Sequence, residues 1–215
     1  LPLCEKALAV HERQLGPDHP ATATSLNNLA LLHYAMGQYE RARPLYERAL
    51  RIREVQLGRD HPDTATSLSN LGALHMSAGH YDEALPLLER ALAIRQSRMG
   101  TEHLDTAAAL SNLAALYEST GQCGRALPLY EQALRIHETQ LGPEHPSTAI
   151  SLNNLAVLYR SLGQYDKALP LCERALAIKK RVLGSDHPDT ARGMGNLAAL
   201  YESLGDYAKA LGLHE

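Results

Sequence analysis

The chain has 215 residues, of which 45% are hydrophobic, which is enough to bury a core and argues against intrinsic disorder. The formal net charge is −3 at pH 7, with acidic and basic residues interspersed, which argues against nucleic acid and anionic membranes as partners. The apolar residues are mostly Leu and Ala, with ten Tyr, no Phe and no Trp, which favours closely packed helices over a sheet. We therefore expect an all-α protein.

Neither a membrane segment nor a secretion signal is evident. No apolar run approaches the roughly 18 residues of a membrane span, and the first residues lack a basic stretch leading into a signal core. Cys4, Cys123 and Cys172 have no metal-ligand spacing, and we interpret them as core residues of a reducing compartment. The sequence therefore predicts a cytoplasmic protein.

A repeat of 42 residues runs through the whole chain. His-Pro occurs at residues 19, 61, 145 and 187, with His103-Leu104 in the remaining position. Each unit contains two glycine turns, one after Leu or Met as at Gly16, and one in the middle as at Gly37. Two turns in each unit imply two secondary-structure elements in each unit.

In the first complete unit, the segment from Pro20 to Gly37 is predicted to be a helix. Its apolar residues recur at helical spacing, as in Leu26, Leu29 and Ala30. Either Asp18 or His19 could cap its beginning, and glycine suits its end. We call this type of segment the first helix of a repeat.

The segment from Tyr39 to Gly58 is predicted to contain the second helix of the repeat. Its apolar residues face inward, and its charged side chains are expected to face outward. Pro44, and the prolines at 86, 128 and 170, are expected to bend the helix slightly.

The short loops make the two helices antiparallel, and neither can bury its apolar face alone, so successive hairpins must stack into a solenoid. The expected organisation is a single array over residues 1–215: a partial second helix (1–16), four complete repeats (17–58, 59–100, 101–142 and 143–184) and a truncated last repeat (185–215). Because both ends fall within a second helix, we expect the sequence to be a fragment of a longer array.

The repeat resembles the tetratricopeptide pattern at both of its helices and at the turn between them. The matching residues are Leu26, Leu29, Ala30, His33, Gly37, Tyr39, Ala42, Tyr46 and Ala49. The length of 42 residues and the turn sequence LGxxHPxT resemble the kinesin light chain type. This resemblance implies a right-handed superhelical solenoid of helix-turn-helix repeats that binds protein, with the first helices lining a concave groove. The pattern is broken by Leu104, Cys123, Gly124 and Gly212, so the third unit is expected to be looser.

The candidate groove residues are asparagines at one position of every first helix, two further asparagines beside them, and a varied set of neighbours. The set is Asn28, Asn70, Asn112, Asn154, Asn196, Asn27, Asn153, Tyr34, Met76, Glu118, Arg160 and Arg192. The resemblance implies that the repeated asparagine clamps the backbone of a bound peptide. The alternative is that each amide bonds the neighbouring repeat and only stabilises the stack. Small residues such as Ala73 and Ala115 leave room for an apolar anchor of the partner.

Other functions find less support. The histidine at position 19 and its four equivalents lie one to a repeat, too far apart to share a metal ion, and are interpreted as loop and capping residues. No nucleotide, nucleophile or metalloprotease motif occurs, so we expect neither enzymatic activity nor a cofactor. The leading interpretation is a scaffold for a protein or peptide partner. Two alternatives stay open: a spacer that associates end to end through its truncated terminal repeats, and a sensory module of a larger regulatory protein.

Overall fold

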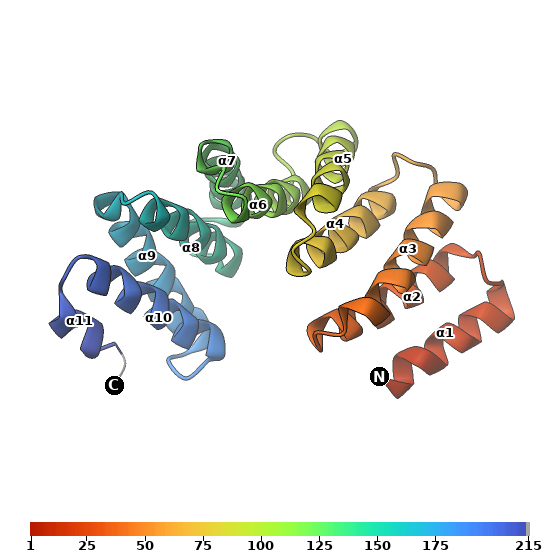
Figure 1. Ribbon diagram of the computed structural model, residues 1–215, viewed down its shortest axis with the longest axis horizontal. Helices are drawn as coiled ribbons and strands as arrows, with labels where there is room; N and C mark the ends of the chain where they lie inside the picture. The colour runs from red at the N-terminus through yellow and green to blue at the C-terminus, as the bar shows by residue number, and fades with distance from the viewer. Residues whose placement is uncertain (214–215) are drawn as a thin grey trace. The chain divides into compact units, whose positions relative to one another are not determined.

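The computed structural model describes residues 1–213, which form eleven α-helices joined by short loops (Figure 1). The helices are α1 (Pro2–Leu15), α2 (Pro20–Ala35), α3 (Tyr39–Gln56), α4 (Pro62–Ser77), α5 (Tyr81–Met99), α6 (Leu104–Ser119), α7 (Cys123–Leu141), α8 (Pro146–Ser161), α9 (Tyr165–Leu183), α10 (Pro188–Ser203) and α11 (Tyr207–Leu211). The even-numbered helices are the predicted first helices. This arrangement confirms the all-helical repeat.

The residues separate into two compact units, each of which is described by itself. The first unit, Leu1–Thr101, contains α1 to α5, and the second, from Glu102 onward, contains α6 to α11. Within each unit every helix packs mainly against the helices that precede and follow it in the sequence. Consecutive hairpins therefore stack, as the burial argument requires.

The core of each hairpin is a repeated set of small and branched apolar side chains. In the first repeat Ala23 and Leu26 of α2 pack against Ala49 and Ile52 of α3, and all four side chains are buried. The equivalent group in the second unit comprises Ala149 and Leu152 of α8 with Ala175 and Ile178 of α9. Alanine at half of these positions lets the two helices approach closely.

The turn sequence LGxxHPxT has a structural reason at each marked residue. Gly58 has φ of 102°, a conformation that favours glycine. His61 is the N-cap of α4, where its Nδ1 accepts the amide hydrogen of Asp63 at 3.1 Å. The buried Thr64 hydroxyl donates to the carbonyl oxygen of Gly58 at 2.8 Å. Of the two capping candidates, histidine and not the preceding aspartate fills this role.

The departures in the third unit leave its helices intact. α6 begins at Leu104, and His103 caps it by accepting the amide hydrogen of Asp105 at 3.1 Å. α6 has 16 residues and α7 has 19, the same lengths as α8 and α9. The expected looseness is therefore not visible as a shortened or interrupted helix.

Candidate functional site

The repeated asparagines lie in the middle of the first helices, at equivalent positions. Asn28 on α2 is exposed, and the other four are half-buried. The four are Asn70 on α4, Asn112 on α6, Asn154 on α8 and Asn196 on α10. What each amide contacts decides between the two alternatives left open by the sequence.

Two of these amides bond the preceding repeat. Asn70 Nδ2 donates to Asn27 Oδ1 at 2.8 Å, which links α4 to α2. Asn196 Nδ2 donates to Asn153 Oδ1 at 2.7 Å, which links α10 to α8. In both cases the acceptor precedes the repeated asparagine of its own helix by one residue. At these two positions the asparagine holds neighbouring repeats together.

The amides of Asn112 and Asn154 make no hydrogen bond to any residue in the described part of the chain. In the other two pairs the acceptor is an asparagine, Asn27 or Asn153. For Asn154 the equivalent position in the preceding repeat is Ser111, whose side chain is shorter than that of asparagine. Both asparagines belong to the second unit and are half-buried. Their donors and acceptors are therefore available to a ligand.

We expect the Asn153–Asn196 bond to stabilise the second unit measurably. A double-mutant cycle with Asn153→Ala and Asn196→Ala should give a coupling free energy of about 0.5 to 1.5 kcal/mol, because each single change removes the same hydrogen bond. Urea unfolding measures it. Asn154→Ala is the matched control and should show no coupling to Asn196→Ala. A coupling near zero between Asn153 and Asn196 would contradict the inter-repeat role.

The other candidate residues, which vary from repeat to repeat, also make contacts within the protein. The Tyr34 and Ser77 hydroxyls lie 2.8 Å apart, at the ends of α2 and α4. Glu118 accepts a hydrogen bond from the Tyr130 hydroxyl at 3.0 Å. Burial raises the pKa of Glu118, and that hydrogen bond and the charge of Arg160 oppose the shift. Part of this row therefore serves the fold as well as any ligand.

Two further candidates, Met76 and Arg192, differ in how accessible they are to a ligand. Met76 is half-buried on α4 and leaves part of its side chain accessible. Arg192 on α10 is exposed and forms an ion pair with Asp189, one turn earlier in the same helix. Arg192 therefore presents less free charge than its sequence suggests.

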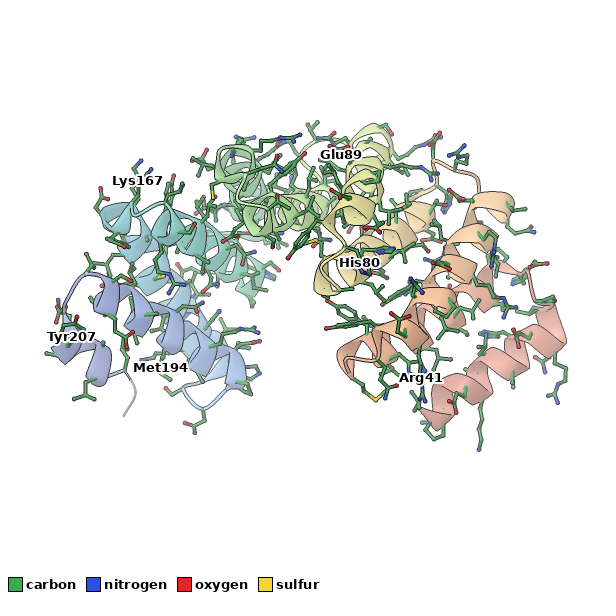
Figure 2. The ribbon with its side chains drawn as sticks, in the orientation of Figure 1. Arg41, His80, Glu89, Lys167, Met194 and Tyr207 are labelled. Carbon is green, nitrogen blue, oxygen red and sulfur yellow. The ribbon has the colours of Figure 1, made fainter. Side chains whose placement is uncertain are left out.

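One aromatic position near the end of the first helices makes side-chain contacts in the repeats of α2 and α8. Tyr159 is buried and donates a hydrogen bond to Glu131 on α7 at 3.1 Å. The Lys167 ammonium, labelled at the start of α9 in Figure 2, lies 5.3 Å from the centre of the Tyr159 ring. At the equivalent position His33 Nδ1 lies 2.7 Å from Gln38 Oε1. These contacts give this position a role in packing.

A buried basic position on the second helices was not recognised in the sequence, where charged side chains were expected to face outward. Its members are His11, Arg53, Arg95, His137 and Lys179. Arg53, Arg95 and Lys179 are at most 8% exposed, so the expectation is wrong at this position. The available signal was a basic residue at one fixed place in every repeat.

Among residues 1–213, no group of three or more His, Cys, Asp or Glu side chains is arranged to hold a metal ion. The five capping histidines instead each accept a backbone amide hydrogen in their own turn. In the same residues no helix combines the length and hydropathy needed to cross a membrane.

A stack of helical hairpins with polar first-helix faces defines a repeat scaffold, and comparison with known proteins gives its family. The tetratricopeptide repeat matches at residues 1–54, 26–97, 63–139, 105–180 and 147–215. The chain therefore belongs to the tetratricopeptide repeat family, which is typically a protein-interaction scaffold and not an enzyme family. No curated protein matches it.

Two solved structures are similar over most of the chain. BtubC (BKLC) from P. vanneervenii is 30% identical, with a TM-score of 0.79 over 98% of this chain and 83% of that one. A Podosopora anserina putative kinesin light chain with nearly identical TPR-like repeats is 32% identical, with a TM-score of 0.75 over 91% of this chain and 93% of that one. MamA, at 19% identity and a TM-score of 0.55, shares the fold alone. The resemblance to the kinesin light chain type is confirmed.

Proposed function

We propose that this chain binds an extended segment of another protein along the first-helix face of its second unit. The observation that carries the proposal is the pair of half-buried amides of Asn112 and Asn154, which have no partner among the described residues. A primary amide offers a donor and an acceptor together, and this matches the N–H and C=O of an extended peptide backbone. Such gripping is independent of the sequence of the partner.

The contacts of the other asparagines reduce the number of residues that can bind the partner. Asn70 and Asn196 each use one donor on the preceding repeat, so they contribute less to a ligand than their position suggests. Asn153 is occupied as the acceptor of Asn196. The proposed binding residues are therefore Asn112 and Asn154. Glu118 and Arg160, one or two turns further along the same helices, would determine which partner sequences are preferred.

Space for a partner side chain accompanies the free amides. Ala115 and Val157 follow Asn112 and Asn154 by three residues, and both are only half-buried. Neighbouring positions on a helix three residues apart lie on one face. A partner segment with one bulky apolar residue therefore fits this surface, since such anchors dominate the energetics of protein interfaces.

The test is selection of binders from a displayed library of random 12-residue peptides, followed by affinity measurement on individual peptides. Replacing Asn112 and Asn154 together by alanine should weaken the selected peptides by at least about tenfold, because two bidentate backbone contacts are lost. The melting temperature should not fall, since alanine favours the helix.

The Asn28→Ala variant is the matched control, because Asn28 occupies the equivalent position in the first unit and should not affect binding to the second. If every selected peptide bound the double variant as tightly as the unchanged protein, the proposed surface would be wrong. The same result would leave the role of the Asn153–Asn196 bond in stability untouched.

A further inference from the structure

At the buried basic position of the second helices, Arg53 in the first unit shows how the side chain finds hydrogen-bond partners. Arg53 on α3 donates to the Ser67 hydroxyl at 2.9 Å and to the carbonyl oxygen of Asp63 at 3.1 Å. It also donates to the Thr24 hydroxyl at 3.3 Å. Serine follows the basic residue by 14 positions and threonine precedes it by 29.

In the last complete repeat the same position is Lys179, and both hydroxyl partners are missing. The equivalent of Thr24 is Ile150, and the equivalent of Ser67 is Gly193. Lys179 is only 6% exposed, yet its ammonium makes no hydrogen bond or ion pair within residues 1–213. The Lys179 side chain is largely buried and lines a pocket, so its ammonium is an unpaired cation that a ligand in the pocket can reach.

A pocket in the second unit adjoins Lys179. It has a volume of about 120 Å³ and is lined by Pro146, Ile150, Ile178, Lys179, Val182, Leu183, Asp189 and Arg192. A Cβ atom built at Gly193 would lie 3.8 Å from Lys179 Nζ, so the glycine lies beside the ammonium. We call this the Lys179 pocket.

The charges around the pocket leave one cation uncompensated. Arg192 at its edge is paired with Asp189. The Asp189 carboxylate also lies 3.9 Å from His187 Nδ1. Burial lowers the pKa of Lys179, the charge of Arg192 lowers it further, and Asp189 and Cys172 act in the opposite direction. An anion beside the Lys179 ammonium would favour its charged form and so oppose the effect of burial.

We propose that the Lys179 pocket binds the carboxylate of a ligand whose neighbouring group is a short branched aliphatic chain. The carboxylate accepts hydrogen bonds from the Lys179 ammonium, and the aliphatic group packs against Ile150 and Val182. Ile150 is 55% exposed and Val182 is 46% exposed, so the aliphatic group of the ligand would shield both side chains from water. None of the repeated asparagines lines the pocket, although Ile150 lies one turn before Asn154 on α8.

The size of the pocket limits the ligand. A cavity of about 150 Å³ in another protein holds benzene, so the Lys179 pocket accommodates a group of four or five carbon atoms. Two sources provide this chemistry: a free branched short-chain carboxylic acid, and the last residue of a polypeptide that ends in valine or leucine.

Titration followed by NMR of the isoleucine methyl groups tests the proposal and separates the two sources. The probes are 3-methylbutanoate and the peptide acetyl-Gly-Gly-Val with a free carboxylate. We expect saturable shifts of the Ile150 and Ile178 signals with at least one probe, and no saturation with 3-methylbutanamide or the peptide amide. Tighter binding of the peptide by tenfold or more assigns the site to a polypeptide C-terminus, and equal or tighter binding of the free acid assigns it to a metabolite-like acid.

Two variants make the result specific to Lys179. Lys179→Met keeps most of the aliphatic stem and removes the charge, and Gly193→Ser returns the hydroxyl that Arg53 uses; each should weaken binding at least tenfold while the circular dichroism spectrum stays helical. Binding should also raise the pKa of Lys179, measured from its Cε chemical shift. The Asn112→Ala, Asn154→Ala variant should bind both probes like the unchanged protein. Absence of saturation with both acids, or equal binding of acids and amides, would overturn the proposal.

Discussion

Replacing Leu152 by alanine is expected to lower the free energy of unfolding of the second unit by about 3 to 5 kcal/mol. Leu152 on α8 is fully buried and packs against Ala175 and Ile178 of α9. The alanine neighbours of this cluster have no side-chain freedom to fill a cavity, so the loss should lie near the upper end for a leucine. Urea unfolding followed by circular dichroism measures the change.

Ile150→Ala is the matched control, since Ile150 lies two residues away on the same helix and is 55% exposed. Its loss should be below about 1 kcal/mol. Native-state hydrogen exchange adds a spatial test: protection should fall in α8 and α9 and much less in α11. Equal losses for the two variants would show that Leu152 is not part of a close-packed core.

Gly72→Ala is expected to destabilise the first unit by up to about 2 kcal/mol, although alanine is the better helix former. A Cβ atom at residue 72 on α4 would lie 2.8 Å from Cδ2 and 2.9 Å from Cγ of Leu88. Leu88 is 1% exposed on α5 and cannot move into solvent. Overpacking of about 1 to 3 kcal/mol therefore outweighs a gain of about 1 kcal/mol in helix propensity.

The repeats themselves suggest the compensating change. Alanine occupies the equivalent of residue 72 elsewhere, and Ala156 in the second unit is followed at the equivalent of Leu88 by Cys172. The double variant Gly72→Ala, Leu88→Cys should therefore be less destabilised than the sum of the two single variants, by at least about 1 kcal/mol. Thermal unfolding of the four proteins completes the cycle, and a Gly72→Ala variant more stable than the unchanged protein would refute the steric argument.

The helices and turns could be predicted because five copies of one pattern carry the information. The glycine turns, the proline that follows four of the five capping histidines, and the spacing of Leu26, Leu29 and Ala30 indicate where the helices begin and which side is buried. Whether Asp18 or His19 caps the helix could not be predicted, because spacing does not show which side chain turns toward the amide of Ala21. The structure assigns that bond to His19 Nδ1 at 3.1 Å.

The candidate site was predictable in position and not in contacts. The repeated asparagine marks one face, but whether its amide is free depends on the preceding residue of the neighbouring repeat, as with Asn153 and Asn196. Lys179 was missed for a related reason. A single basic residue among the charged residues of a second helix is typical of a solvated face, and only the packing of the next hairpin shows that Lys179 is buried.

The packing of each helix against its sequence neighbours has a kinetic consequence. Within each unit nearly all tertiary contacts join residues from adjacent helices, so the chain segments that must close to form them are short. Closing short segments sacrifices little chain entropy, and low contact order is associated with fast folding. Folding can then begin at any hairpin and spread in either direction. A chain of this kind tolerates the gain or loss of a whole hairpin, because no distant partner has to adjust.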